Sequence, residues 1–281
     1  MPRRSANRQP MTFDAEHAAL GLETTEDAFL GGKLMIAQPK SGPRAGLDAV
    51  FLASACPAKA GDKVLEAGAG SGIVALAVAQ RVLGVTATGV EIDASLATLA
   101  SRNAAANGLA GAVRFVQGDV TGSSGALAGL GLTPSSFDHV LANPPFLLAG
   151  AARLPPHAML RRAHAASSGE LEGWVRFLAG FARPGGTLTL IHRADALPRL
   201  LPLLHGRFGA LTLFPLFPHA EEPASRILIH GIKGSRAPLR MQQGLVLHGE
   251  DGSFTAAAEA VLRAGARLEL HGGAPHLPEE F

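Results

Sequence analysis

The segment KVLEAGAGSGIVALAVAQ, residues 63–80, contains the features that decide the fold. It begins with an apolar run typical of a buried strand and ends with the Ala- and Val-rich pattern of a buried helix. Three glycines lie between them, Gly68, Gly70 and Gly72. Glycine permits sharp turns and lets a ligand approach the backbone, and a helix N-terminus adds a local positive potential. The segment therefore predicts a strand–turn–helix unit with a ligand site at the turn.

Apolar runs and Ala/Leu-rich stretches alternate along the chain after this unit. Strands that alternate with helices are the signature of a parallel α/β sheet. Residues 30–46 are predicted to be a Gly-rich loop, and the tail from residue 241 a short hairpin and a terminal helix. The predicted strands are 63–68, 86–92, 112–116, 137–142, 187–192, 210–217 and 225–232, and the predicted helices are 47–53, 73–83, 94–108 and 171–182.

Acidic residues stand at the ends of the first three strands of this predicted sheet. Glu66 and Glu91 close the first and second strands, and Asp119 follows the third. Open α/β sheets bind ligands in the crevice at the carboxyl ends of their strands, and an acid about 20 residues beyond the glycines can hold ribose hydroxyls. Taken singly, each acid is more often a plain strand-end residue. In series, they predict a nucleoside site.

The glycine spacing leaves two cofactor classes to compare. Gly70, Gly72 and Ala75 match the looser dinucleotide pattern G-x-G-x-x-A, which would indicate an oxidoreductase. The spacing E-x-G-x-G-x-G, with Glu66 at the strand end, fits a nucleoside cofactor without a pyrophosphate better. We therefore favour the second class.

The segment HVLANPPFLL, residues 139–148, runs from an apolar strand into two prolines. Proline lacks a backbone N–H and fixes φ, so the strand must stop there. One interpretation is a rigid turn. The other is a rigid ledge at the end of the sheet that presents the amide of Asn143 and the ring of Phe146 to a ligand.

Composition limits the class of protein. In 281 residues, hydrophobic residues make up 47% and charged residues 17%, which is enough apolar surface for a large core. The single cysteine, Cys56, excludes an intrachain disulfide and a multi-cysteine zinc site. No run reaches the roughly 18 apolar residues of a membrane span. Residues 1–10 are basic without a following apolar run, so we expect a disordered tail and a cytoplasmic protein.

Charge is distributed unevenly along the chain. Residues 61–152 contain four basic and six acidic residues, whereas residues 153–240 contain twelve basic and five acidic ones. A basic segment of this kind suits an anionic partner, although ordinary solvated arginines give the same count. No His, Cys and Asp cluster has the spacing of metal ligands, so no metal is expected.

Residues 62–143 resemble the class I S-adenosylmethionine-dependent methyltransferases in the glycine turn and the acids after the second and third strands. The resemblance implies a Rossmann-like α/β fold: a seven-stranded, mostly parallel sheet with an antiparallel terminal strand and a short C-terminal extension. It divides the chain into a flexible tail (1–25), a methyltransferase domain (26–233) and an extension packed on that domain (234–281). The implied S-adenosyl-L-methionine site consists of Glu66, Gly68, Gly70, Gly72, Glu91, Ile92, Asp119, Val120 and Asp48.

Asn143-Pro144-Pro145-Phe146 resembles the [DNS]-P-P-[YFW] motif of methyltransferases that act on planar NH2 groups. An exocyclic amine is a poor nucleophile because its lone pair is delocalised into the ring. The Asn143 amide oxygen and the Pro144 carbonyl could each accept one of its hydrogen bonds, which would point the lone pair at the methyl group. Phe146 would stack on the target ring. These four residues are the implied catalytic set.

The series FLGGKLMIAQPK, SGPRAGLDAVFLAS, VLEAGAGSG, GVEID, LANPPF and PLRMQQGLVLHGEDG is similar to the bacterial tRNA(Val) (adenine-N6)-methyltransferase-like family over roughly residues 26–270. This similarity implies tRNA as partner and adenine N6 as acceptor, with Gln38 near the cofactor or substrate mouth. Phosphates and a splayed-out base would be held by basic residues. The implied substrate-binding residues are Lys40, Arg44, Arg153, Arg161, Arg162 and His164.

Three other functions remain open from the sequence. A protein glutamine-N5 methyltransferase would use the same Asn-Pro-Pro ledge, but usually carries a helical domain before the cofactor domain. An rRNA guanine-N2 methyltransferase often carries a degenerate second half, and none is visible here. A non-catalytic RNA-binding protein on this fold would be expected to lose the glycines, Glu91 or Asn143 first, and all are present.

Overall fold

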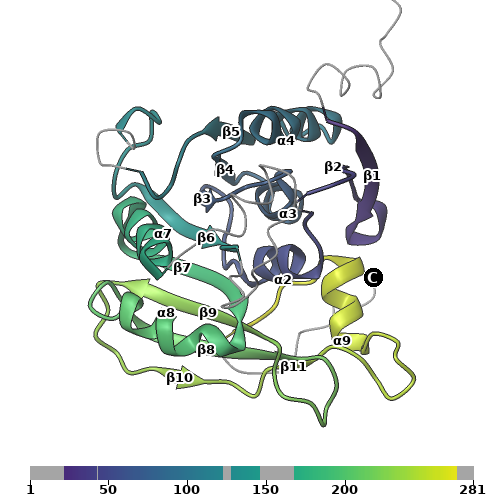
Figure 1. Ribbon diagram of the computed structural model, residues 1–281, viewed down its shortest axis with the longest axis vertical. Coiled ribbons are helices and arrows are strands. Elements are labelled where there is room, and N and C mark those ends of the chain that lie inside the picture. The colour runs from purple at the N-terminus through teal and green to yellow at the C-terminus, as the bar shows by residue number, and fades with distance from the viewer. Residues whose placement is uncertain (1–21, 43, 123–127, 146–167, 271–281) are drawn as a thin grey trace, which may run out of the picture.

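The architecture is a nine-stranded sheet covered by helices on both faces, with a separate two-stranded hairpin, in the part of the chain that the structure describes. The structure is a computed structural model that describes residues 22–42, 44–122, 128–145 and 168–270 (Figure 1). The strand order in the large sheet is β10-β8-β9-β7-β6-β3-β4-β5, and β11 also pairs with β8. The sheet is therefore built from strands that are not in sequence order, with β3 near its centre.

The first half of the sheet is parallel, as expected from its alternating pattern. β3 pairs with β4 on one side and β6 on the other, and β4 pairs with β5. Each predicted strand and helix here is confirmed to within two residues. The elements are β3 (Lys63–Ala67), α3 (Ile73–Arg81), β4 (Thr86–Glu91), α4 (Ala94–Ala106), β5 (Val113–Gln117) and β6 (Phe137–Ala142).

The second half contains the antiparallel part. β9 lies between β7 and β8 and is antiparallel to both, so the predicted closing pair is confirmed. The described sheet has nine strands where seven were expected, because two short strands of the C-terminal extension add to the edge of β8. The elements are α7 (Ser168–Phe181), β7 (Ala182–Arg193), the 3-10 turn η2 (Ala194–Ala196), α8 (Leu197–Leu204), β8 (Phe208–Phe217) and β9 (Arg226–Lys233).

Pro215 lies inside β8, where a proline would normally cost a ladder hydrogen bond. The partner edge is interrupted at this point. β10 (Arg240–Met241) pairs with β8 residues before Pro215, and β11 (Leu245–Val246) pairs with residues after it. The missing N–H of Pro215 therefore falls in the gap between two short strands.

The prediction of a loop at residues 30–46 is wrong in part. This range contains a short 3-10 turn, η1 (Leu30–Gly32), and β2 (Leu34–Pro39), which forms an antiparallel hairpin with β1 (Thr24–Phe29). The short hairpin predicted in the tail is confirmed by an antiparallel bridge between His248 and Phe254, where the Gly249 N–H donates to the Ser253 carbonyl oxygen. β10 and β11 precede this hairpin, and each pairs with the edge of β8. The predicted terminal helix is confirmed as α9 (Ala256–Glu259), which continues as the π-helical turn η3 (Ala260–Ala264).

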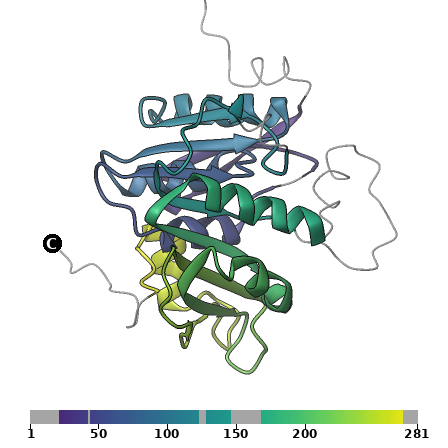
Figure 2. The same cartoon turned by 90° about the vertical axis from the view of Figure 1, so that its left-hand side faces the viewer.

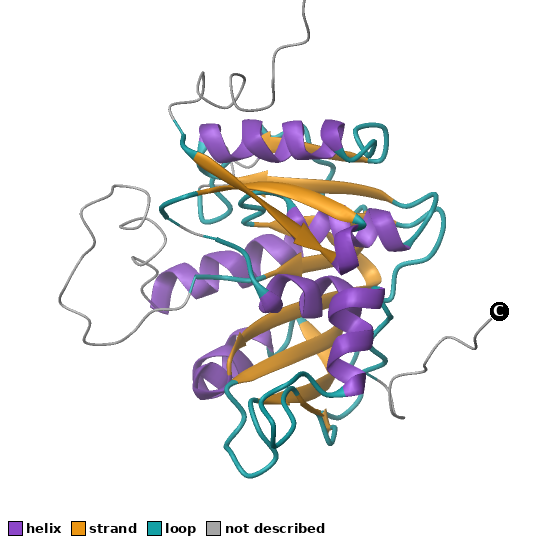
Figure 3. Cartoon of the chain, turned by 90° about the vertical axis from the view of Figure 1, so that its right-hand side faces the viewer, coloured by secondary structure: helices purple, strands orange, loops and turns teal. Residues whose placement is uncertain are grey.

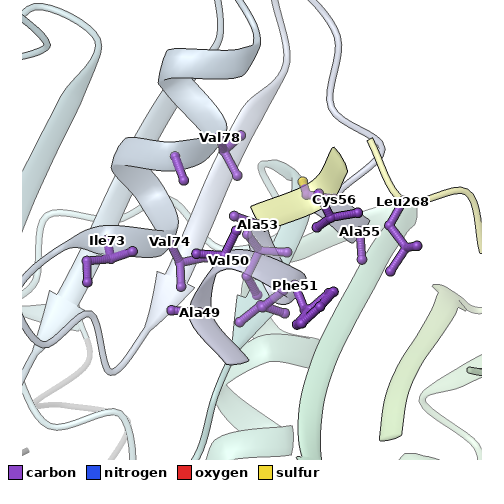
Figure 4. Close-up of a cluster of buried hydrophobic side chains, with 14 of the residues drawn as sticks. Ala49, Val50, Phe51, Ala53, Ala55, Cys56, Ile73, Val74, Val78 and Leu268 are labelled. Carbon is purple, nitrogen blue, oxygen red and sulfur yellow. The ribbon is translucent and has the colours of Figure 1, made fainter. Parts of the chain in front are cut away.

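A hydrophobic core lies on each face of the sheet. One face is covered by α2 (Leu47–Ala55), α3 and the C-terminal helix, and the other by α7 and α8, as the two side views show (Figures 2 and 3). In the first core, Val50 and Phe51 of α2 lie with Val74 of α3, and Leu268 from the C-terminal segment lies near Cys56 (Figure 4). Cys56 is fully buried and burial raises the pKa of its thiol to about 11, so it is a packing residue.

The C-terminal helix also contacts the turn of the β1–β2 hairpin. Lys33 Nζ donates to the carbonyl oxygen of Ala264 at 3.0 Å, at the C-terminal end of η3. Gly31, with φ of 66°, allows the close approach: a Cβ there would lie 2.8 Å from the Arg263 carbonyl oxygen. The turn of the N-terminal hairpin and the C-terminal helix therefore lie side by side (Figure 1). None of the described helices has the length and apolar character needed to cross a membrane.

Candidate active site

The glycine turn after β3 holds a backbone conformation that other residues rarely adopt. Gly68, Gly70 and Gly72 have φ of 70°, 54° and 89°, in the left-handed region where a Cβ is unfavourable. The N–H groups of Gly68 and Ala69 both donate to the carbonyl oxygen of Val90 in β4, at 2.8 and 3.0 Å. The neighbouring strand thus fixes the first half of the turn.

The three glycines face different surroundings. A Cβ on Gly68 would overlap the indole ring of Trp174 from α7, and one on Gly72 would lie 2.6 Å from the Phe115 ring of β5. A Cβ on Gly70 would meet no atom of the structure within 4 Å. Two glycines therefore let aromatic rings pack beneath the turn, whereas Gly70 faces the space in which a ligand could approach the backbone.

Glu91 connects the end of β4 to this turn. Its Oε2 accepts the N–H of Gly70 at 2.8 Å, and its Oε1 accepts the N–H of Asp93 at 2.9 Å. Burial raises the pKa of this carboxyl, although the two N–H donors oppose the effect. Each oxygen retains a lone pair, so a carboxylate in this position can also accept from hydroxyl groups of a ligand.

Glu66 lies beneath the turn, 3% exposed. Its Oε2 accepts the N–H of Ala75 in α3 at 2.9 Å. Burial raises the pKa of Glu66 well above its ordinary value, and the nearby Glu91 carboxyl raises it further. Neither Glu66 nor Glu91 forms an ion pair with a described residue, so the two buried acids make a site that a cationic ligand would complement.

The other predicted residues of this site differ in exposure. Asp119 is exposed, and its Oδ1 accepts from the N–H and the hydroxyl of Thr121 at 2.8 and 2.6 Å. Ile92 is 44% exposed, as a residue that covers a flat ring could be. Val120 is buried in the core under α7, so its side chain is committed to packing.

The ledge begins beside the glycine turn. Ala142, the last residue of β6, pairs with Ala67 of β3, which places Asn143 next to Gly68 across the sheet. The Asn143 Oδ1 is buried and accepts no hydrogen bond from the described residues. Buried polar atoms almost always have partners, so an orphaned acceptor requires an explanation. Pro144 is buried and Pro145 half-buried, and Phe146 lies outside the described residues.

Comparisons with known proteins agree with this geometry. Residues 44–172 match the methyltransferase small domain family. A solved structure from Agrobacterium tumefaciens, described as a predicted O-methyltransferase, is 28% identical with a TM-score of 0.65, over 76% of this chain and 94% of that one. Residues 44–172 are thus similar to S-adenosylmethionine-dependent methyltransferases in sequence and in fold.

Three relatives show which members of this methyltransferase class the chain resembles. A tRNA1(Val) (adenine(37)-N6)-methyltransferase of Shewanella sp. strain W3-18-1 is 34% identical over 145 residues, 51% of this chain and 59% of the relative. The chain therefore covers less than two thirds of that protein. A protein of the same name from Dickeya chrysanthemi is 23% identical over 90% of this chain and 98% of its own length. A release factor glutamine methyltransferase of Gloeobacter violaceus is 30% identical over 56% of this chain and 55% of its own length.

The cofactor of this methyltransferase class is S-adenosylmethionine, and the residues of the turn fit it. Gly70 leaves space against the backbone, and Glu91 offers lone pairs to ribose hydroxyls. Burial disfavours the ionised forms of Glu66 and Glu91, and the ammonium and sulfonium of a bound cofactor would favour them. The individual assignments, including Asp119 to the adenine amine, stay predictions. Among the described residues, no group of three or more His, Cys, Asp or Glu is arranged to hold a metal ion.

Four further predicted residues have structural partners. Asp48, at the start of α2, accepts from Arg226 Nε at 2.8 Å, and Arg226 begins β9 at the same edge of the sheet as the site. Arg44 binds within the hairpin region, to Asp27, Thr25 and the Pro39 carbonyl. Gln38 is buried and binds Asp27 and both backbone groups of Ala45, and Lys40 pairs with Glu23 on the surface.

The hairpin residues thus have roles in holding residues 38–45, whatever their part in substrate binding. The remaining predicted substrate-binding residues, Arg153, Arg161, Arg162 and His164, lie outside the described residues.

Sequence reasoning missed three side chains that shape the site. Trp174 and Phe115 pack beneath the glycine turn, and Asn103 of α4 binds its backbone. One signal was available: Asn103 lies four residues from Leu99 and seven from Leu96, on the apolar face of its helix. A polar residue on such a face indicates a specific hydrogen-bonding role.

Proposed function

We propose that the chain transfers a methyl group from S-adenosylmethionine to an exocyclic amine, and that this amine is N6 of an adenine in tRNA. The observation that carries the proposal is the buried, unpartnered Oδ1 of Asn143 beside the glycine turn. An unsatisfied buried acceptor costs about 1–3 kcal/mol. A substrate N–H that reaches this oxygen would recover that cost.

The ledge residues supply two hydrogen-bond acceptors in a fixed direction. The Asn143 amide oxygen and the Pro144 carbonyl oxygen would each accept one N–H of the planar amine. Two such bonds favour a pyramidal nitrogen, whose lone pair is then available for attack. Because Pro144 and Pro145 fix the backbone, the acceptors are preorganised, and little reorganisation is needed when the substrate binds.

The bound cofactor supplies an electrophilic methyl group on a positively charged sulfur. The protein residues orient the partners: Glu91 and Asp119 would hold the ribose and the adenine of the cofactor, and the glycine turn would contact its methionine part. Asn143 cannot act as a base, because its neutral amide accepts hydrogen bonds without taking up the proton that the amine releases. Its role is therefore positioning of the nucleophile rather than proton transfer.

Adenine in tRNA is favoured over the glutamine amide by the extent of the similarity. The Dickeya relative aligns over 90% of this chain, whereas the Gloeobacter release factor enzyme aligns over 56%. The excess of basic over acidic residues in 153–240 also suits binding to the phosphates of an RNA backbone. In this proposal Phe146 stacks on the target base, and Arg153, Arg161, Arg162 and His164 contact RNA. A tRNA substrate would place the protein in the cytoplasm.

A transfer assay with tritiated S-adenosylmethionine tests the proposal directly. Bulk tRNA, rRNA and a protein extract are offered separately, and the labelled product is identified by chromatography. Label in tRNA as N6-methyladenosine is expected. Label in protein as methylglutamine would replace tRNA with a glutamine substrate and leave the role of the ledge intact. Label in rRNA as N2-methylguanosine would replace adenine in tRNA with guanine in rRNA as the methyl acceptor.

Asn143→Ala isolates the ledge from the cofactor site. We expect transfer to fall by at least about a hundred-fold, while the affinity for S-adenosylhomocysteine, measured by titration calorimetry, stays within about two-fold. Asn143→Asp, which keeps an acceptor oxygen of the same reach and stays within the motif, should retain more activity than the alanine variant. Full turnover by Asn143→Ala would refute the positioning role.

A further inference from the structure

Two asparagines of α4 bind the backbone of β2 in the N-terminal hairpin. Asn103 Oδ1 accepts the N–H of Ala37 at 3.0 Å, and its Nδ2 donates to the Ala37 carbonyl at 3.0 Å. Asn107 repeats the pattern with Met35, accepting at 2.9 Å and donating at 2.8 Å. The two amides thus replace a neighbouring strand along the outer edge of β2.

The repeat follows from the geometry of the two elements. Residues four apart on a helix rise about 6 Å, and residues two apart on a strand rise about 6.7 Å. Asn103 and Asn107 therefore match Ala37 and Met35 in spacing. An open strand edge exposes unpaired backbone groups, and these side chains satisfy them. One explanation of both residues is accordingly structural: they attach the hairpin to the domain.

Asn103 makes one contact that this explanation does not require. Its Nδ2 also donates to the carbonyl oxygen of Ser71 at 2.9 Å, and Asn103 is fully buried. Ser71 lies between Gly70 and Gly72 in the cofactor turn. The corresponding second bond of Asn107 Nδ2 goes to the carbonyl of Asn103 within its own helix.

The turn is therefore held from two sides. Glu91 accepts the N–H of Gly70 from the β4 side, and Asn103 donates to the carbonyl oxygen of Ser71 from the α4 side. Glycines impose no rotamer or Cβ constraint of their own, so the orientation of these peptide groups depends on such partners. The same Asn103 amide connects the turn to Ala37 of the hairpin.

We infer that Asn103 is a positioning residue for the cofactor: it orients the glycine turn and couples it to the N-terminal hairpin. Cofactor binding then orders β2 through Asn103. Gln38, the buried residue that follows Ala37, in turn binds the backbone of Ala45 just before α2. The inference depends on the cofactor site of the methyltransferase class and not on the identity of the methyl acceptor.

Asn103→Ala and Asn107→Ala form a matched pair, since each removes the same two bonds to β2 and one further donor bond. The probe is S-adenosylhomocysteine, titrated by calorimetry, with thermal unfolding measured in parallel. Asn103→Ala is expected to weaken the affinity about ten-fold or more, the size of one buried hydrogen bond, and Asn107→Ala by no more than about two-fold. Equal losses in the two variants, or an unchanged affinity in Asn103→Ala, would overturn the positioning role.

Hydrogen exchange of the wild-type protein keeps the inference testable if Asn103→Ala does not fold. Addition of S-adenosylhomocysteine should slow exchange of the Ala37 amide, which donates to Asn103, more than exchange of the Met35 amide, which donates to Asn107. Protection of the glycine turn with no change at Ala37 would contradict the coupling. Because neither measurement uses a methyl acceptor, a failure of the tRNA proposal would leave these results unaffected.

Discussion

Substitution of the glycines in the cofactor turn should separate folding from ligand binding. A Gly68→Ala change places a methyl group where the indole ring of Trp174 lies and holds φ at 70°. A Gly70→Ala change imposes similar strain at φ of 54°, but its methyl group meets no atom of the described residues within 4 Å. The two variants therefore differ in steric overlap and in which side of the turn they fill.

The loss of unfolding free energy in each variant follows from backbone strain and steric overlap. A left-handed alanine costs about 1–2 kcal/mol, and overpacking a buried ring costs about 1–3 kcal/mol. Gly68→Ala should then lose roughly 2–5 kcal/mol of unfolding free energy and Gly70→Ala roughly 1–2 kcal/mol. For a domain of this size, these losses correspond to a fall in Tm of roughly 10 °C and roughly 4 °C.

Thermal unfolding and titration with S-adenosylhomocysteine measure both effects. Gly70→Ala should weaken the affinity about ten-fold or more despite its smaller loss of stability, because its methyl group occupies the ligand side. In a Trp174→Phe background, Gly68→Ala should cost less than it does in the wild type, since the smaller ring leaves room. Equal costs in the two backgrounds, or full affinity in Gly70→Ala, would refute this account of the turn.

Three further predictions concern buried charge and the hairpin. Burial raises the pKa of Glu66, so the contribution of this carboxyl to stability should be fully present below its ordinary pKa of 4.5 and be lost as pH rises; Glu66→Gln should raise Tm more at pH 8 than at pH 5, and an equal gain at both would contradict this. Burial lowers the pKa of His192 from 6.5 to about 4, so the contribution of this imidazole to stability should be lost as pH falls from 6.5 towards 4. His192→Leu should flatten that decrease in urea unfolding, whereas the exposed His205→Leu should leave it unchanged. Lys33→Met removes the bond to Ala264 and should speed hydrogen exchange in the hairpin turn without changing exchange in β3, as mass spectrometry can show.

The sequence was sufficient to predict the sheet and the outline of the site. Its apolar runs predicted β3 to β9, and its glycines and strand-end acids predicted the turn after β3. Both signals are local, because the spacing of apolar residues and the residue types of a turn are read from neighbouring positions in the chain. The same reasoning placed Asn143 at the end of a strand. It could not show that Asn143 Oδ1 is buried without a partner, since that depends on every surrounding element.

Other features depend on contacts between distant parts of the chain. The residue range 30–46 contains no strong strand pattern, and β2 forms because β1 and the amides of α4, 66 residues away from Ala37, satisfy its two edges. β10 and β11 are each two residues long and exist because β8 offers them a free edge. Trp174 lies beneath Gly68 only once α7 packs on the sheet. The sequence thus determined the strands and helices of the main sheet, whereas tertiary packing decided the short strands and how the glycine turn is supported, because hydrogen bonds and ring contacts between distant segments leave no local pattern.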